Sequence, residues 1–564
     1  MKTEKSTIWK KAINNGLLAG ALCLLVMLVG LVEAFGDTYI ISGVISLGDL
    51  ILLAPVIGLT YTTLRNASQL QKSTQAGISA AVGLISGCII TLLILLGNIV
   101  NLRSMFVNAS PALFEMLMRG VPSPLGALIP PIECAIASLV IFGVYLLPAR
   151  LRTAVLQGAM WVILIGALRN QILVIDLFKF QPISAVLRSI FFATSGLKPL
   201  GAVIVFVIIT GLLYYSSGRK KGPVVTKSPK VIRRNRIILY AFLAIVLLSL
   251  PYALGIFYSE ILDTVGYFII MGLGLNIVVG FAGLLDLGYV AFYAIGAYTM
   301  GVLTSQLANY SFWVVLPIAL VITWFAGIIL GLPVLRMRGD YLAIVTLGFG
   351  EIVRLLALSD WLKSLLGGTQ GIQQIAQPHI GPLALDNLQK LYYLILIGIA
   401  IVTFIAWRLK DSHLGRSWMA LREDEDVAQA MGINLVLTKL LAFSTGALFA
   451  GLAGTFGAVK LTSVYPHSMQ FIVSINVLVM IIIGGMGSIP GVFVGGLVLV
   501  GLPALLSEFE EYKFWFYGLA LVAMMLFRPE GLWPEARRKL ELHEEVVPEE
   551  PPPVEPGRVE EVGG

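Results

Sequence analysis

Long apolar segments alternate with short polar ones along most of the chain. Many of them are close to the ~20 residues that an α-helix needs to cross a bilayer. Before residue 216 the pattern predicts about six such helices, at residues 14–35, 39–61, 76–100, 125–147, 153–175 and 197–215. After residue 236 it predicts about ten, at residues 237–258, 262–281, 284–306, 312–334, 341–358, 391–408, 438–458, 469–488, 490–507 and 513–528. We therefore expect an all-α fold, a polytopic membrane bundle of about 16 spanning or re-entrant helices, some of them broken by glycine.

Two segments interrupt this pattern and divide the chain. Residues 216–236 are basic, contain Pro and Gly and lack periodicity, so they are expected to form a cytoplasmic linker. The linker separates an N-terminal membrane extension, residues 1–215, from a second domain, residues 237–535. Residues 536–564 are acidic and rich in proline, which predicts a disordered cytoplasmic tail. The basic N-terminus and the apolar run after it are expected to form an uncleaved first helix rather than a secretory signal.

The composition requires a lipid environment for much of the surface. Of the 564 residues, 57% are hydrophobic and 13% charged, against about 25% charged in an ordinary soluble domain. The formal charge of +7 is gathered mainly near predicted helix ends. With the helix count above, most of these basic clusters fall on one side, which the positive-inside rule assigns to the cytoplasm. The expectation is a multi-pass protein of the bacterial inner (plasma) membrane with both termini in the cytoplasm.

The sequence offers little for a cofactor or a metal. Its three cysteines lie in apolar runs, and its four histidines are far apart, so neither a metal site nor any other cofactor is expected. No GK dipeptide occurs, so the glycine-rich segments at 272–274 and 484–488 are not nucleotide loops, and this chain does not hydrolyse ATP through that motif. The scattered charge likewise gives no basis for nucleic-acid binding.

Ionisable residues at membrane depth are more informative, because each is costly unless it faces protein or water. Glu133, Asp286 and the i,i+3 pair Glu351 and Arg354 are such residues, and Asp286 lies in a glycine-broken apolar stretch at residues 280–288. Structural pairing and lining of a translocation path are both open for them. Small-residue pairs such as Gly16 and Gly20 predict close helix packing.

The polar segment 410–434 lies between two predicted spans on the cytoplasmic side. It has helical propensity, with a charged start and small residues toward its end. It could be a short helix that docks on a partner or a solvated connecting loop.

Several long motifs of the second domain, in order, carry a family resemblance. They are GLLDLGYVAFYAIGAY at 283–298, LRMRGDYLAIVTLGFGEIVR at 335–354, GGTQGI at 367–372, GRSWMALREDEDVAQAMGIN at 415–434 and GGMGSIPG at 484–491. The chain resembles the permeases of branched-chain amino acid ABC importers, the LivH/LivM type, and is most similar to the LivM branch. The resemblance runs through most of residues 262–535.

The resemblance implies a permease subunit that forms a path for leucine, isoleucine and valine. The partners it implies are a second, LivH-like permease, two cytoplasmic ABC ATPases, a periplasmic binding protein and the lipid bilayer. It implies that the polar segment contacts the ATPase, through Arg422, Glu423, Asp424, Glu425, Asp426, Ala428 and Gly432. The candidates for the translocation path are Asp286, Tyr289, Tyr293, Thr346 and Glu351. The glycines expected to be structural are Gly283, Gly288, Gly339, Gly368, Gly484, Gly485 and Gly487.

Two features depart from the family pattern. Relatives typically lack a counterpart of residues 1–236, which leaves an accessory bundle, a lipid-facing scaffold and a regulatory partner site as possible roles. The stretch around Asp286 and Tyr289 differs from the Ser, Asn and His common in relatives, so urea and short amides remain alternative substrates. A stand-alone secondary carrier or channel and a membrane enzyme acting on lipid or prenyl substrates are the competing classes. Few intramembrane charges and scattered histidines disfavour them.

Overall fold

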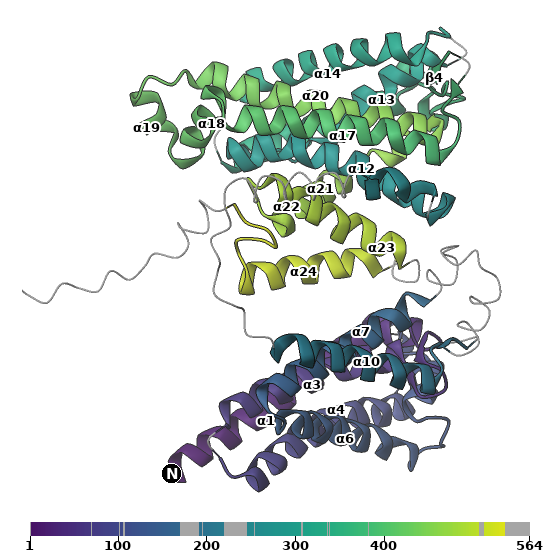
Figure 1. Ribbon diagram of the computed structural model, residues 1–564, viewed down its shortest axis with the longest axis vertical. Helices are drawn as coiled ribbons and strands as arrows, with labels where there is room; N and C mark the ends of the chain where they lie inside the picture. Colours follow the sequence, from purple (N-terminus) through teal and green to yellow (C-terminus); the bar gives the residue numbers. More distant parts are fainter. Residues whose placement is uncertain are drawn as a thin grey trace, which may run out of the picture. The chain divides into compact units, whose positions relative to one another are not determined.

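The computed structural model describes residues 2–169, 191–218 and 245–535, apart from short gaps at 69, 101, 105, 107, 194–195, 253, 306–307, 335–336, 338, 382 and 507–511. The predicted linker therefore lies almost entirely outside the described residues, and the predicted tail lies wholly outside them. The chain divides into two compact units, Met1–Leu247 and Leu248–Gly564, which are shown in Figure 1.

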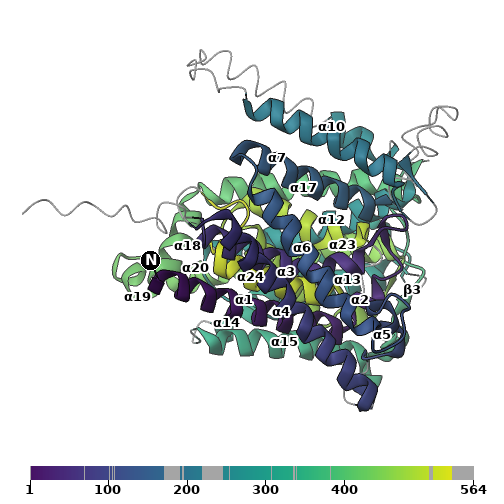
Figure 2. The same ribbon diagram turned by 90° about the horizontal axis from the view of Figure 1, so that it is seen from below.

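The first unit is built from long helices with short connections. Its long helices are α1 (Lys2–Val29), α3 (Leu47–Asn66), α4 (Lys72–Ile99), α6 (Ile129–Tyr145), α7 (Ala149–Ala167) and α10 (Pro199–Gly218). Its short elements are α2 (Leu31–Ala34), β1 (Tyr39–Ile41), β2 (Ile45–Ser46), η1 (Leu102–Ser104), α5 (Pro111–Leu117) and η2 (Gly126–Leu128). Helix α4 packs against α1, α3 and α6, while α7 pairs with α10, as the two views in Figures 1 and 2 show.

Small residues set the spacing of these helices. A Cβ added to Gly20 of α1 would lie 2.4 Å from Ile89 of α4, and one added to Gly87 of α4 would lie 2.3 Å from Pro131 of α6. Close backbone approach compensates in lipid for the missing hydrophobic attraction between helices. The pair Gly16 and Gly20 thus packs α1 on α4, as the sequence spacing predicts.

The second unit contains the longest buried helices. Its helices, in chain order, are α12 (Ile256–Leu275), the π-helical η4 (Asn276–Phe281), α13 (Val290–Thr304), α14 (Phe312–Val334), α15 (Asp340–Leu358), η5 (Asp360–Leu362), α16 (Lys363–Leu366), η6 (Gly368–Gln370), α17 (Leu388–Lys410), α18 (His413–Glu423), α19 (Glu425–Ala430), α20 (Leu435–Leu461), η7 (Pro466–Ser468), α21 (Phe471–Gly484), α22 (Ile489–Gly496), the π-helical η8 (Leu497–Gly501), α23 (Leu502–Leu505) and α24 (Lys513–Phe527). Its strands are β3 (Ile372–Gln373), β4 (His379–Ile380), β5 (Leu383–Ala384) and β6 (Ser463–Val464). They pair antiparallel as β3 with β6 and β4 with β5.

Helices α12 and α20 form the core of this unit. In the most apolar stretch of each span, 78% of the residues are buried for α12 with η4 and 61% for α20, against 39% for α14. Helix α20 packs against α12, α13 and α14. Its Gly454 touches the backbone of Tyr293, where an added Cβ would lie 2.1 Å from the carbonyl oxygen. A helix that is apolar on all sides and lined with small residues is buried among other helices.

The prediction of an all-α polytopic membrane bundle is confirmed. Within the described part of the chain, 11 helices are long and apolar enough to cross a membrane. Three shorter apolar helices, Val290–Thr304, Ile489–Leu505 and Lys513–Leu526, lie in the second unit. The first of these follows the glycine-containing stretch that ends at Tyr289, so helix breaking falls where the sequence indicates. The expected spans 153–175 and 237–258 extend outside the described residues.

Candidate coupling and translocation site

The segment between α12 and α13, residues 276–289, is called here the broken stretch. It begins as the π-helical turn η4 and continues without regular structure to Tyr289. The Asn276 side chain accepts a hydrogen bond from the backbone N–H of Gly487, at 2.8 Å. A Cβ on Gly280 would lie 2.2 Å from Asn276 Oδ1. This part of the chain is therefore fixed to the glycine-rich turn before α22 by a hydrogen bond from a backbone N–H to the Asn276 side chain.

Asp286 and Thr346 lie together where the broken stretch meets α15. The backbone N–H of Leu287 donates to Thr346 Oγ1 at 3.0 Å, and that of Gly288 donates to Asp286 Oδ1 at 3.0 Å. The other carboxylate oxygen of Asp286 is buried and has no hydrogen-bond partner among the residues that the structure describes. A Cβ on Gly288 would lie 1.7 Å from the carbonyl oxygen of Thr346, so only glycine fits this contact.

The next two residues connect the broken stretch to α20 and α21. Tyr289 is fully buried, and its hydroxyl donates to the carbonyl oxygen of Gly446 in α20 at 2.8 Å. The backbone N–H of Val290 donates to Ser474 Oγ of α21 at 2.9 Å. The broken stretch and the first residue of α13 thus contact three helices of the second unit through hydrogen bonds.

The other two path candidates lie elsewhere. Tyr293 packs beside Tyr267, with ring centroids 6.2 Å apart. Glu351 forms an ion pair with Arg354, as the i,i+3 spacing indicates, and 40% of its side chain is exposed. Glu351 comes five residues after Thr346 on α15, which places it on a different face of that helix. The structure therefore brings Asp286, Tyr289 and Thr346 together but leaves Glu351 outside their cluster.

The polar segment 410–434, called here the coupling segment, folds into α18 and α19. Figure 1 shows these helices at one end of α20, with β4 at the other end. Trp418 is fully buried, and its indole N–H donates to the carbonyl oxygen of Thr438 at 2.9 Å. Asp424 ends α18 and caps α19, because its carboxylate accepts from the backbone N–H groups of Asp426 and Val427 at 2.9 Å. These contacts fix the segment on the start of α20.

Arg422 connects the coupling segment directly to the broken stretch. Its Nη1 donates to the carbonyl oxygen of Gly280 at 2.8 Å. A Cβ on Gly283, whose φ is +72°, would lie 2.4 Å from Arg422 Cγ. The glycine therefore permits both the left-handed turn and the close approach of the arginine.

The remaining coupling candidates divide between two faces. Glu425 forms an ion pair with Lys439 of α20, whose side chain is 2% exposed, and Ala428 is also buried. Glu423, Asp424, Asp426 and Gly432 are exposed. Two exposed apolar residues of the same surface, Val427 and Met431, were not among the expected residues. Lys439 was also missed, although a lysine inside the predicted span 438–458 was a usable signal.

The expected structural glycines lie mostly at left-handed or crowded positions. Gly339, Gly368, Gly485 and Gly487 have φ values of +56°, +58°, +121° and +81°. Gly484 accepts the backbone N–H of Trp533 at 2.9 Å, and a Cβ on it would lie 2.1 Å from Gly491 O. The turn around Gly485 is thereby attached to the segment after α24.

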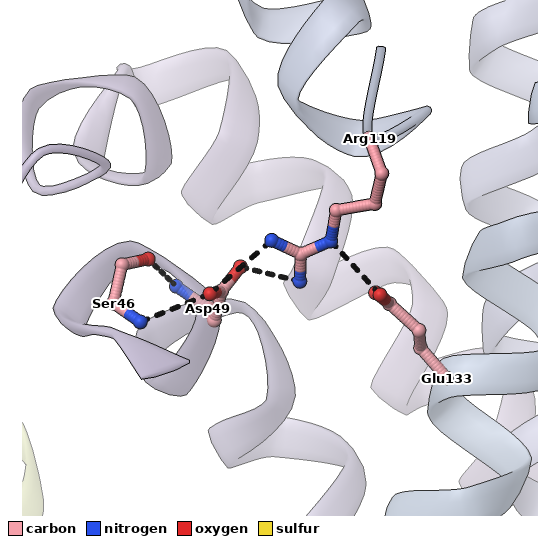
Figure 3. A network of polar contacts seen from close by, with 4 residues as sticks. All are labelled: Ser46, Asp49, Arg119 and Glu133. Atoms are coloured by element: carbon pink, nitrogen blue, oxygen red, sulfur yellow. Dashed lines mark hydrogen bonds and ion pairs between the residues drawn. The ribbon is translucent and has the colours of Figure 1, made fainter. Parts of the chain in front are cut away.

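In the first unit, Glu133 belongs to the polar network of Figure 3. Arg119 donates to Glu133 at 2.9 Å and to Asp49 at 2.9 Å. Asp49 also forms a reciprocal capping box with Ser46 at the start of α3. Burial by itself lowers the pKa of Arg119, but the hydrogen bonds and charges of Glu133 and Asp49 outweigh it and raise that pKa above its usual value. Glu133 therefore has a structural partner on a connecting segment.

Comparison with known proteins decides what the second unit is. Residues 257–528 match the family model described as the branched-chain amino acid transport system permease component. The LivM permease of Salmonella typhimurium is 42% identical over 298 residues, which cover 49% of this chain and 69% of that protein. The chain belongs to the branched-chain amino acid transport permease family. It is a multi-pass membrane protein and a transport permease subunit. The resemblance expected from the sequence motifs is confirmed.

Relatives from both the LivM and the LivH branch are similar in sequence to this permease. The LivM permease of Escherichia coli K12 is 43% identical over 298 residues, with 49% of this chain and 69% of that protein covered. The LivH permease of the same organism is 28% identical over 193 residues, with 32% of this chain and 62% of that protein covered. No solved structure matches this permease. Residues 1–256 lie outside the family match.

Proposed function

We propose that the chain is the LivM-like permease subunit of an ATP-driven importer for branched-chain amino acids in the bacterial inner membrane. Family membership supports the transport role, and the names of the relatives support the substrate class. The proposed partners are a second, LivH-like permease, two cytoplasmic ABC ATPases and a periplasmic substrate-binding protein. Both termini of the chain are proposed to be cytoplasmic, on the side of the coupling segment.

The observation that carries the proposal is the hydrogen bond from Arg422 to Gly280. It joins a polar segment at one end of the unit to the broken stretch, which in turn contacts α15 and α20 and leads directly into Val290, which contacts α21. Movement of the coupling segment by an ATPase would thereby reach three helices of the bundle. A segment with two discrete packing arrangements is the element that an ATP-driven alternating-access cycle requires.

The exposed face of α19 is the proposed contact with the ATPase. It presents Val427 and Met431, which are 58% and 79% exposed, beside the carboxylates of Glu423 and Asp426. Exposed apolar side chains surrounded by polar ones mark protein–protein contacts. Glu425 and Arg422 point toward the permease and act inside it.

Affinity purification in mild detergent followed by reconstitution tests the proposal. The tagged chain is expected to co-purify with ATPase subunits and a second permease. With the binding protein and internal ATP, liposomes are expected to accumulate labelled leucine, isoleucine or valine. The same vesicles without ATP are the control. Accumulation of urea in place of these amino acids would reassign the substrate, and transport by the chain alone would contradict the importer proposal.

A further inference from the structure

The side chain of Asp263 lies fully buried in α12, and neither of its carboxylate oxygens has a hydrogen-bond partner in the described part of the chain. An orphaned carboxylate inside a protein is costly, and buried polar groups are paired in the great majority of cases. Nothing in the coupling site uses this residue. A buried carboxylate is relieved of this cost either by protonation or by a cation that pairs with it.

A buried lysine contacts α12 at positions on either side of this carboxylate in the sequence, Thr264 and Glu260. Lys460, in the last turn of α20, has a side chain that is 7% exposed. Its ammonium donates to Thr264 Oγ1 and lies 3.9 Å from Glu260 Oε1. The contact with Glu260 is long, and 57% of the Glu260 side chain is exposed to its surroundings. The lysine is therefore held weakly by its present carboxylate, while a second carboxylate, which forms no hydrogen bond among the described residues, belongs to the residue just before Thr264.

The two carboxylates occupy successive positions on one face of α12. Glu260 and Asp263 are spaced i,i+3, so their side chains are neighbours on the helix surface. A slide of α12 by about 4.5 Å together with a rotation of about 60° would bring Asp263 to the place that Glu260 holds relative to α20. The flexible lysine side chain reduces the movement needed. Helix shifts of this size occur in known conformational transitions.

The position of this cluster links it to the coupling segment. Helix α12 continues into η4, whose Gly280 accepts the hydrogen bond of Arg422. Helix α20 begins directly after the coupling segment and carries Lys460 at its far end. The same two helices thus pass from the coupling segment to the Glu260, Asp263 and Lys460 cluster at the opposite end of the unit.

We propose that Asp263 is the alternate partner of Lys460, and that the transport cycle moves the lysine from Thr264 and Glu260 to Asp263. Lys460 would change its partner when α12 moves from one packing arrangement on α20 to the other. It rests on the proposed importer function, since it needs a cycle with two states. In the present state Lys460 bonds to Thr264, and in the other state it neutralises the buried aspartate.

Charge-exchange variants of the complete reconstituted complex test this exchange. Asp263→Asn is expected to lower ATP-dependent leucine uptake about tenfold or more. It should leave the Tm of the resting complex unchanged or raise it, because the Asp263 carboxylate forms no hydrogen bond among the described residues in that state. The double variant Asp263→Lys with Lys460→Asp is expected to recover uptake relative to either single change. Asp386→Asn, at an exposed i,i+4 pair with Lys390, is the matched control and should transport normally.

The outcomes separate the two proposals. Wild-type uptake by Asp263→Asn contradicts the exchange. A loss of uptake together with a lower Tm also contradicts it, because unfolding would then explain the loss. Either result leaves the importer function standing, because the wild-type complex is active in the same assay. A wild-type complex that shows no ATP-dependent uptake removes both proposals together.

Discussion

At the scale of single residues, Arg422 is the side chain on which coupling most depends. Arg422→Ala removes the hydrogen bond to Gly280 while leaving the exposed face of α19 intact. We expect ATPase subunits to bind and hydrolyse ATP, with substrate transport per ATP about tenfold lower. Parallel measurement of uptake and phosphate release checks this. Arg422→Lys should recover part of the loss, and an unchanged ratio of transport to hydrolysis in Arg422→Ala would disprove the role.

Gly288 gives a prediction about stability at the same scale. Gly288→Ala places a Cβ 1.7 Å from the carbonyl oxygen of Thr346, so α15 must shift, at a cost of about 1–3 kcal/mol or more. The Tm of the purified protein should fall. Gly348→Ala in α15 is the control, because its Cβ would meet no atom of the described residues within 4 Å. Equal Tm values for the two variants would contradict the packing described here.

The sequence alone predicted only some of the contacts in this site. The spacing of Glu351 and Arg354 predicted their ion pair, and the glycines around Asp286 predicted a broken helix. The contacts of Tyr289 with Gly446 and of Arg422 with Gly280 join residues 157 and 142 positions apart. No local pattern encodes such separations, so these contacts could not be found without the fold.

At the scale of elements, the coupling segment shows what a polar pattern can and cannot predict. Its helical character is present in the sequence, but a single short helix was expected where two occur. The division falls at Asp424, whose extended backbone, with φ of −157°, lets it end one helix and cap the next. Which carboxylates face inward depends on α20, so the inward position of Glu425 could not be predicted.

The anchor of α19 on α20 gives an element-scale prediction. Glu425→Gln leaves the buried Lys439 ammonium without its counter-charge, which costs about 3 kcal/mol where a buried pair is broken. Amide hydrogen exchange across residues 425–434 is expected to accelerate. Glu423→Gln, whose side chain is 66% exposed, is the matched control and should alter exchange little. Equal protection in both variants would show that the ion pair does not hold α19.

At the scale of the whole molecule, the division into two units predicts that the second unit folds and inserts without the first. The second unit has its own buried core around α12 and α20 and contains the whole family match. Deletion of residues 1–216 is therefore expected to leave a permease that inserts with unchanged orientation, since an even number of predicted spans is removed. Cysteine labelling from each side of the membrane checks this. Labelling of the coupling segment from the outside would refute the expected topology.

The central claim is that ATP hydrolysis by separate ATPase subunits of the proposed complex drives the transport of branched-chain amino acids through this permease. Accumulation of labelled leucine in liposomes that contain the purified complex and binding protein tests it most directly. The account predicts uptake above the external concentration that requires internal ATP and stops in Arg422→Ala. Leucine that only equilibrates, or accumulates without ATP on a proton gradient, would contradict it and favour a stand-alone carrier.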